Sequence, residues 1–204
     1  AFLRIGDDRV DVSHAGFSSP QNAIEAWEKA YWQAFETGDS PEPVIRAYLN
    51  TAIENGIPAN TMNAYFRAMK EDLFKTRFAI FDQLIHYMEG SAIPVGRAMP
   101  YILGVKEPYT YSEAFERADA LSIAMQLSNF WRDIGQDWQI GRVYLPQEDL
   151  DRFAIREEDL AVGRINSNFV ELLEFEIERT QEYYCTAREG IPMLASGQWG
   201  VMSG

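Results

Sequence analysis

The sequence predicts an all-α fold, and three features support this prediction. Apolar residues recur at three- and four-residue spacings through most of the chain, which is typical of helices with one buried face. Proline and glycine fall where helices should begin and end. No stretch alternates apolar and polar residues strongly enough to build a sheet. The 204 residues, 47% of them hydrophobic, suffice for one sizeable core, so we expect a single domain spanning residues 1–204.

The first half of the chain predicts four helices, at residues 1–12, 20–38, 41–56 and 58–74. The first begins in the middle of its pattern without a capping residue, so we expect the chain to continue upstream. The second and third each open on a Ser-Pro pair, which places proline at the first helical position, and each closes on glycine. The second and third have the spacing of packed scaffold helices.

Two basic residues, Lys75 and Arg77, follow the fourth predicted helix in the stretch LFKTRF. Arginine can bind a pair of phosphate oxygens in a bidentate manner. Cations are also favoured at helix C-termini, and turns between helices are often basic for solubility. The sequence leaves a phosphate role and a purely structural role open.

The second half of the chain predicts one long helix and three other helical segments. A segment around residues 86–96 carries small residues that would let a neighbouring backbone or a ligand approach closely, and Pro94 should kink it. The long helix spans residues 111–140 and ends at a glycine. A short helix at 147–152, a run of acidic turns, and a helix at 166–189 follow.

The chain is acidic, with a formal net charge of −13 and an isoelectric point near 4.6. This charge argues against nucleic acid, or an anionic membrane surface, as a purely electrostatic partner. An anionic substrate would need a metal ion in order to approach. The one cysteine, Cys185, excludes an intrachain disulfide, and we expect a cytoplasmic protein. No apolar run is long enough to predict a membrane span.

Five polar residues on the long helix form the strongest candidate site. Asn129, Asp133 and Asp137 are four residues apart and share one helix face, with Gln126 and Arg132 beside them. Mg²⁺ prefers oxygen ligands and is usually held by one or two carboxylates together with substrate phosphates. This polar stripe therefore indicates a site for a metal ion and a phosphate. The alternative is a solvated helix face, because acids at this spacing are common on surfaces.

A second acidic pair with the same spacing, Asp7 and Asp11, lies near the start of the chain, and Arg4 precedes it. The long helix is otherwise largely apolar, so we expect its acids to face an enclosed space, where acids need a partner. Two acidic pairs facing each other across a helical bundle could hold several Mg²⁺ ions around a diphosphate.

These residues carry a resemblance to a known family. AFLRIGDDRVD and QLSNFWRDIGQDWQIGRVYLP resemble the two aspartate-rich regions of the squalene/phytoene synthase family, whose members join prenyl diphosphates head to head. EDLFKTRF, HYMEGSAIPVG and GRVYLPQEDLDRFAI resemble further family segments in the expected order. The resemblance implies the isoprenoid synthase fold, an all-α helical bundle around a central apolar cavity. It also implies that this chain is truncated at both ends.

The resemblance implies roles for the candidate residues in a prenyltransferase that depends on Mg²⁺, with Mn²⁺ as an alternative. Tyr87 matches a tyrosine that faces the reacting carbons, where it can stabilise an allylic cation or move a proton; its own sequence pattern favours a core tyrosine. The implied metal ligands are Asp7, Asp11, Asn129, Asp133 and Asp137, and the four aspartates and Tyr87 are the implied catalytic residues. The implied substrate-binding residues are Arg4, Gln126, Asn129 and Arg132. The side chains expected to line a dry channel for the carbocation are Phe66, Met69, Tyr87, Met125 and Phe130.

The resemblance also implies a substrate and a product. HYMEGSAIPVGRAM and GQDWQIGRVYLPQEDL resemble microbial phytoene synthases most, so we expect two geranylgeranyl diphosphates to be joined, through a cyclopropylcarbinyl diphosphate, into the carotenoid precursor phytoene without NADPH. The alternatives are a squalene, dehydrosqualene or hydroxysqualene synthase that uses farnesyl diphosphate, and a catalytically inactive scaffold protein. The expected partner is the prenyl diphosphate; an oily product also suggests peripheral membrane contact, and the oligomeric state is left open.

Overall fold

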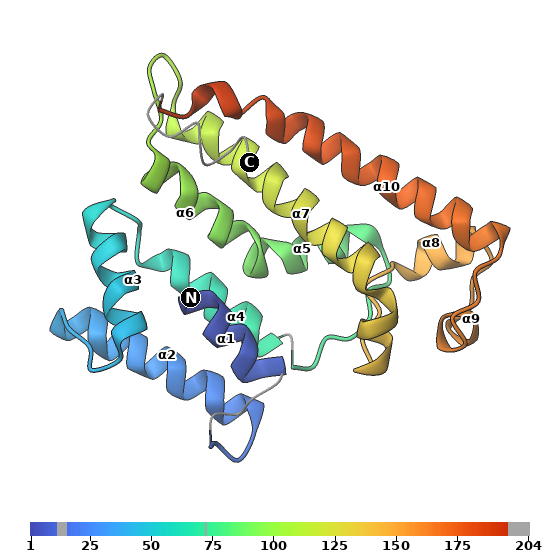
Figure 1. Cartoon of the computed structure of the whole chain (residues 1–204), viewed down its shortest axis with the longest axis horizontal. Helices are drawn as coiled ribbons and strands as arrows, with labels where there is room; N and C mark the ends of the chain where they lie inside the picture. Colours follow the sequence, from blue (N-terminus) through green and yellow to red (C-terminus); the bar gives the residue numbers. More distant parts are fainter. Residues whose placement is uncertain (12–15, 72, 196–204) are drawn as a thin grey trace. The chain divides into compact units, whose positions relative to one another are not determined.

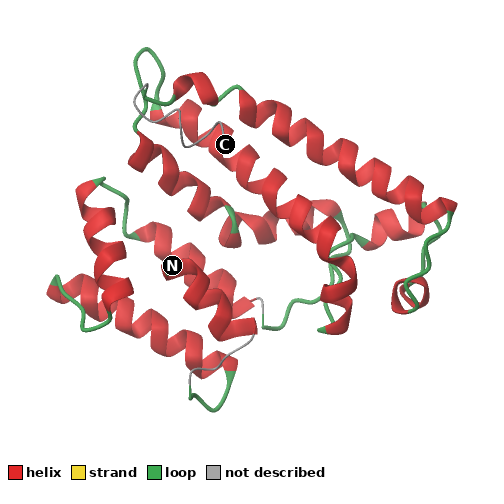
Figure 2. Ribbon diagram, in the orientation of Figure 1, coloured by secondary structure: helices red, strands yellow, loops and turns green. Residues whose placement is uncertain are grey.

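The fold is all-α, as the sequence predicts (Figure 2). The computed structural model describes residues 1–11, 16–71 and 73–195. Within these ranges the regular structure is helical, and the one β-type pairing is an isolated bridge between Val105 and Leu194. No helix in the described ranges combines the length and the apolar character that crossing a membrane requires.

The chain divides into two compact units, Ala1–Phe74 and Lys75–Gly204. The single domain expected for the whole chain stays a prediction. The helices of the first unit are α1 (Phe2–Asp11), α2 (Pro20–Thr37), α3 (Pro43–Glu54) and α4 (Asn60–Glu71).

The beginning of α3 differs from the prediction by two residues. The helix starts at Pro43, with Glu42 as its cap residue, and not at Pro41. The Ser40 hydroxyl accepts the N–H of Glu42 at 3.1 Å, and the Asp39 carboxylate accepts the N–H of Ser40 at 2.7 Å. These bonds hold a turn in place of the first helical residues, because short polar side chains compete with the helix for nearby N–H groups.

The core of the first unit is rich in aromatic rings. Phe2, at the start of α1, stacks on Tyr48 of α3 at 4.6 Å between ring centroids and on Trp27 of α2 at 5.2 Å. Phe66 and Met69 of α4, expected to line a channel, are 0% and 6% exposed and belong to this packed core. The rings therefore hold α1 against the other three helices of the unit.

In the second unit the long helix α7 packs against α6 and α10 (Figure 1). Its observed span, Tyr111–Gln139, agrees closely with the predicted 111–140. A capping box fixes its start, where the Thr110 hydroxyl accepts the N–H of Glu113 and the Glu113 carboxylate accepts the N–H of Thr110. The other helices of the unit are α5 (Phe81–Ser91), α6 (Ile93–Leu103), α8 (Gln147–Arg152), α9 (Glu157–Ala161), α10 (Ser167–Arg188) and the 3₁₀ turn η1 (Ile191–Met193).

Two local features of this unit correct the sequence prediction. Pro94 does not kink one helix; α5 ends before Ala92 and Pro94 lies in the first turn of α6. Proline lacks the N–H that would continue the helical ladder, but it fits the first turn of a new helix. The predicted acidic turns after α8 contain the one-turn helix α9, whose first turn carries three acids.

Gly96 explains how closely α6 approaches α7. A Cβ built on Gly96 would overlap the Ser122 hydroxyl and lie 3.0 Å from the Ala118 carbonyl oxygen, both on α7. The prediction that small residues here admit a neighbouring backbone is therefore confirmed.

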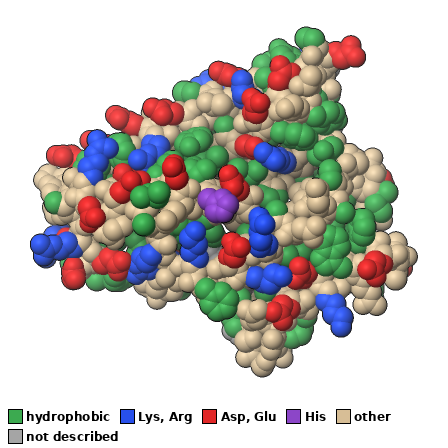
Figure 3. Space-filling view, turned by 180° about the vertical axis from the view of Figure 1, so that it is seen from behind, with side chains coloured by type: hydrophobic (Ala, Val, Ile, Leu, Met, Phe, Trp, Pro, Cys, Tyr) green, Lys and Arg blue, Asp and Glu red, His purple; other side chains and the backbone are tan. Residues whose placement is uncertain are grey.

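On the face drawn in Figure 3, acidic and basic side chains are interspersed rather than gathered into one basic area.

Candidate active site

The polar stripe of α7 is only partly buried. Gln126, Asn129, Asp133 and Asp137 each have intermediate exposure, and the side chain of Asp133 is 28% exposed. Arg132, next to the stripe, is largely exposed. The stripe is thus reachable from solvent within its unit, whereas the sequence predicted acids in an enclosed setting.

Arg132 and Asp133 form a bidentate ion pair. The Arg132 Nε and Nη2 atoms lie 2.7 and 2.6 Å from the two Asp133 carboxylate oxygens. The hydrogen bonds from Arg132 lower the pKa of Asp133 below its ordinary value. Asp133 is therefore a carboxylate at neutral pH, the form that binds a cation. Arg132, expected to bind substrate, uses two donors on its neighbour in this structure.

An aromatic cluster lies beside the stripe and includes Tyr87. The ring of Phe130, on α7, stacks on Tyr144 with 3.8 Å between centroids and 10° between planes. Tyr87 of α5 lies 6.1 Å from Tyr144, 6.5 Å from Phe130 and 5.4 Å from Phe78. Tyr87 is 7% exposed and packs among these rings, which is the core position that its sequence pattern favours; its role toward the reacting carbons stays a prediction.

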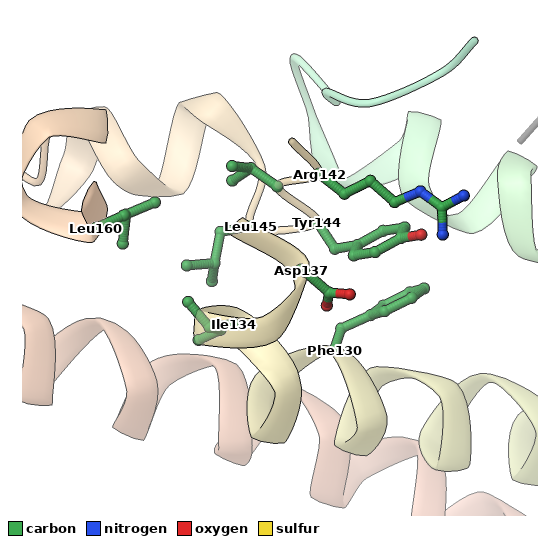
Figure 4. Close-up of a pocket in the computed structure, with 8 residues that line it drawn as sticks. Phe130, Ile134, Asp137, Arg142, Tyr144, Leu145 and Leu160 are labelled. Atoms are coloured by element: carbon green, nitrogen blue, oxygen red, sulfur yellow. The ribbon is translucent and has the colours of Figure 1, made fainter. Parts of the chain in front are cut away.

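A small, partly open pocket of about 10 Å³ lies between the stripe and this cluster at the end of α7 (Figure 4). Figure 4 shows the Asp137 carboxylate beside the rings of Phe130 and Tyr144, with Arg142 next to Tyr144. The rest of the lining is aliphatic and comprises Ile134, Val143, Leu145 and Leu160. The pocket therefore has a charged end and an apolar end.

Arg142 and Tyr144 are the site residues that sequence reasoning missed. Both belong to the GRVYLP loop that follows α7. The loop turns back at once, because the Arg142 N–H donates to the Asp137 carbonyl oxygen at 2.8 Å. The signal available in the sequence is an arginine and a tyrosine directly after the acidic end of a helix.

The first unit carries the second acidic pair on α1. The backbone of Asp7 and Asp11 belongs to α1, but their side chains lie outside the described residues. Arg4 pairs with Asp8, at 3.1 Å between Nε and Oδ1, and both side chains are exposed. The roles predicted for Asp7, Asp11 and Arg4 toward metal and diphosphate stay predictions.

Metal ligation is tested only in part by the described side chains. Among them no group of three or more His, Cys, Asp or Glu residues could hold a metal ion. Asp133 and Asp137, with the Asn129 amide, offer oxygen donors on one helix face, and such a set suits Mg²⁺ when substrate phosphates and waters complete the coordination. The residues present fit the predicted ion.

Three further residues were considered for the site from the sequence, and one of them, Met125, has different surroundings from those predicted. Met125, expected to line the channel, is 55% exposed on α7. Arg77, considered as a phosphate ligand, donates to both oxygens of Glu157 and to the Gly141 carbonyl oxygen. Lys75 lies over the ring of Phe78, with Nζ 4.9 Å from the centroid.

Comparison with known proteins identifies the family of this chain. The family model described as squalene/phytoene synthase matches residues 1–202. The phytoene synthase of Arthrospira platensis is 32% identical over 95% of this chain and 65% of its own length, and phytoene synthase 2 of Solanum lycopersicum is 29% identical over 99% and 66%. The chain thus spans about two thirds of the length of these relatives.

Two solved structures have the same fold. The squalene synthase HpnC from Alicyclobacillus acidocaldarius superposes with a TM-score of 0.82 at 26% identity, covering 95% of this chain and 71% of the other. A dehydrosqualene synthase in complex with a ligand gives a TM-score of 0.83 at 24% identity over 96% and 66%. The isoprenoid synthase fold predicted from the sequence is confirmed, and this chain belongs to the squalene/phytoene synthase family.

Proposed function

We propose that this protein is a prenyltransferase that joins two prenyl diphosphates head to head. The observation that carries the proposal is the adjacency of the polar stripe and the aromatic cluster at the end of α7, where Asp137 lies beside the stacked rings of Phe130 and Tyr144. Ionisation of an allylic diphosphate produces two charges that must be stabilised separately. The carboxylates and amide of the stripe suit the metal ions that bind the leaving diphosphate, and the neighbouring ring faces suit the carbocation.

In this proposal the acids of the stripe hold Mg²⁺, or Mn²⁺, which supplies Lewis-acid stabilisation of the diphosphate. Asn129, Asp133 and Asp137 are the ligands from α7, and Asp7 and Asp11 are the proposed ligands from α1. Gln126 together with the guanidinium groups of Arg4 and Arg132 is proposed to orient the phosphate oxygens. Asp133 is ready for this role because Arg132 lowers its pKa.

The aromatic cluster has the complementary task of protecting the cation. The stacked rings of Phe130 and Tyr144 present π faces that stabilise positive charge, and their apolar surface would shield the cation from water. Tyr87 lies within the same cluster and carries a hydroxyl group. We propose that this hydroxyl positions or moves the proton that the product loses.

For the substrate, we propose geranylgeranyl diphosphate and phytoene as the product, without NADPH. The support is the set of curated relatives named phytoene synthases, at about 30% identity over nearly the whole chain. A second candidate, a C30 synthase that uses farnesyl diphosphate, is favoured by the likeness to the squalene synthase HpnC. The retained acids of both motifs argue against an inactive scaffold protein. Peripheral membrane contact and a cytoplasmic location stay predictions.

The test is a product assay with Mg²⁺ and labelled geranylgeranyl or farnesyl diphosphate, with and without NADPH. Asp133→Asn should lower kcat/KM by about a hundredfold or more, because it removes a charged ligand from the metal. Asp119→Asn is the matched control, since Asp119 lies on the same helix and also pairs with an arginine, Arg97, at 2.7 Å. Phytoene that needs no NADPH and is lost only in Asp133→Asn supports the proposal.

Other outcomes are equally informative. A C30 product would retain the mechanism and replace the substrate. Binding of Mn²⁺, followed by electron paramagnetic resonance, tests the metal site without turnover. If neither substrate gives a product and Mn²⁺ binds equally to the unaltered protein and to Asp133→Asn, the proposed function is wrong.

A further inference from the structure

The loop that carries Arg142 and Tyr144 runs alongside the segment that precedes α5. The N–H groups of Val143 and Gln147 donate to the carbonyl oxygens of Thr76 and Phe78 at 3.0 and 2.9 Å. This backbone pairing holds the loop at Val143 and at Gln147. It does not include Gly141, where the chain leaves α7 with a positive φ of 79°.

Arg77 binds the start of the loop, at Gly141. Its Nη1 donates to the Gly141 carbonyl oxygen at 2.7 Å and to its neighbour Thr76 at 2.8 Å. Its Nε and Nη2 donate to the two carboxylate oxygens of Glu157, in α9, at 2.7 and 3.0 Å. The guanidinium also lies over the Trp138 ring, 5.8 Å from the centroid. We call these contacts of Arg77 with Gly141, Glu157 and Trp138 the Arg77 clamp.

The Arg77 clamp uses most of the donors that a diphosphate would need. Four of the five N–H donors of a guanidinium are taken by protein oxygens in this arrangement. The hydrogen bonds from Arg77 lower the pKa of Glu157, which keeps that carboxylate ionised and bound. A direct phosphate contact would require Arg77 to leave these partners.

The contacts of Arg77 contribute too little to the stability of the fold to be explained by stability alone. The side chains of Arg77 and Glu157 are 39% and 37% exposed, and an ion pair at that exposure contributes little to folding. The contacts instead constrain geometry, since one planar group ties the end of α7, the start of the loop and α9 together. The pocket takes lining residues from the same three places: Asp137, Arg142 and Leu160.

We propose that Arg77 is a positioning residue for the reaction: through Gly141 and Glu157 it fixes the start of the loop, so that Arg142 and Tyr144 lie beside Asp137 in the pocket. The proposal rests on the proposed function, because positioning is defined here by its effect on turnover. A misplacement of about 1 Å in such a site lowers the rate by about a hundredfold.

The test compares Arg77→Gln, Arg77→Lys and Glu157→Gln with the control Arg97→Gln. Arg97 also forms a bidentate exposed pair, with Asp119, but it contacts neither the loop nor α9. We expect kcat to fall about ten- to a hundredfold in all three clamp variants with KM little changed, and to stay near that of the unaltered protein in Arg97→Gln. Lysine should not rescue, because one ammonium group cannot reproduce the planar fork.

Hydrogen exchange supplies a readout that does not depend on turnover. The amides of Val143 and Gln147 should exchange faster in Arg77→Gln than in the unaltered protein, while the amides of α10 should keep their protection. Unchanged exchange in the loop would overturn the proposal, as would unchanged kcat in an active enzyme. If Arg77→Lys keeps the activity of the unaltered protein while Arg77→Gln raises KM, Arg77 contacts a phosphate directly, and the positioning proposal is wrong. If the unaltered protein gives no product, the proposed function fails, and the exchange data still decide whether the clamp holds the loop.

Discussion

Helices α1 and α7 each carry two aspartates four residues apart, but the two helices differ in length and in how they are packed. Helix α1 has 10 residues, and its Phe2 ring anchors it in the aromatic core of the first unit. Helix α7 has 29 residues, begins with a capping box and packs against both α6 and α10. An isolated helix as short as α1 is marginal in water, so its direction depends on packing. The longer helix can hold its acids in place by its own length and by two neighbours.

A close glycine contact at each helix shows how the two supports differ. In α1, a Cβ on Gly6 would overlap the hydroxyl of Tyr65, which donates to the Leu3 carbonyl oxygen at 3.0 Å. At α7, the corresponding contact is made by Gly96 of α6 against Ser122 and the Ala118 carbonyl. The contact on α1 is with a side chain, whereas the contact on α7 includes backbone. A side chain can move out of the way more cheaply than a helix backbone can.

Gly96→Ala should be the most destabilising of the changes proposed for this comparison. The new methyl group meets both Ser122 and a backbone carbonyl, so α6 and α7 must separate; we expect a loss of about 3 kcal/mol of unfolding free energy. Ser122→Ala in the same chain should restore only part of this, because the Ala118 oxygen remains 3.0 Å away. Urea denaturation followed by circular dichroism measures both. Full restoration by Ser122→Ala would show that the backbones are not in tight contact.

Gly6→Ala should cost less, about 2 kcal/mol, and should be easier to rescue. Tyr65→Phe removes the overlapping hydroxyl and leaves ring carbon CZ at 3.1 Å, which a small tilt of the ring can accommodate. The double variant should therefore be more stable than the sum of the two single changes predicts. Gly135→Ala is the control, since nothing lies within 4 Å of its Cβ and alanine favours a helix; it should stabilise α7 slightly. An additive double-mutant cycle for Gly6 and Tyr65 would contradict this account of α1.

The sequence predicts the helices well because their signals are local. Apolar spacing predicted α7 and α10 to within about one residue at each end, and the first Ser-Pro pair predicted the start of α2 at Pro20. The break before Pro94 and the single turn of α9 were misjudged because each depends on a few backbone groups and not on a long pattern.

The candidate site was predicted only where its residues are close in sequence. The stripe on α7 follows from helical spacing, and α7 does carry those residues. The partners of Arg77 could not be predicted, because Gly141 and Glu157 are 64 and 80 residues away. The buried contact of Arg179 with Asp149 likewise joins residues 30 apart. Long-range ion pairs leave no periodic signal in a sequence.

The packing of α10 on α7 should make the free energy of unfolding depend on pH through one buried acid. On α10, which packs on α7, Glu176 is fully buried with Asp149 and one arginine, Arg179, which donates to Glu176 at 3.1 Å and to Asp149 at 2.9 Å. Burial raises the pKa of Glu176 from 4.5 to about 8, against the attraction of Arg179 and with the repulsion of Asp149. The folded state therefore keeps a proton that the unfolded chain releases. Stability should fall as pH rises from about 5 to about 8, by up to about 1.4 kcal/mol per pH unit.

Glu176→Gln should remove this dependence, because glutamine resembles the protonated acid and cannot ionise. Thermal unfolding of the variant should give a flatter stability profile between pH 5 and about 8, and the variant should be the more stable protein at the upper end. Glu174→Gln is the control, since Glu174 lies exposed on the same helix. An equal change of slope in both variants would assign the effect to net charge. A profile that rises with pH in the unaltered protein would show that Glu176 is ionised in the folded state.

The smallest expected effect concerns the arginines beside the two acidic pairs. Arg132 forms an ion pair with Asp133, which belongs to the stripe. Arg4 forms an ion pair with Asp8, which lies between Asp7 and Asp11. Replacing Arg132 by glutamine removes a positive charge and a competing partner from a proposed metal ligand, so Mn²⁺ should bind about threefold more tightly in the absence of substrate. Arg4→Gln should leave Mn²⁺ binding nearly unchanged, because it releases an acid outside the pair. Neither change should shift the melting temperature detectably, since both arginines are largely exposed. Titration by electron paramagnetic resonance compares the two; weaker Mn²⁺ binding in Arg132→Gln would mean that the arginine orients Asp133 for the metal instead of competing with it.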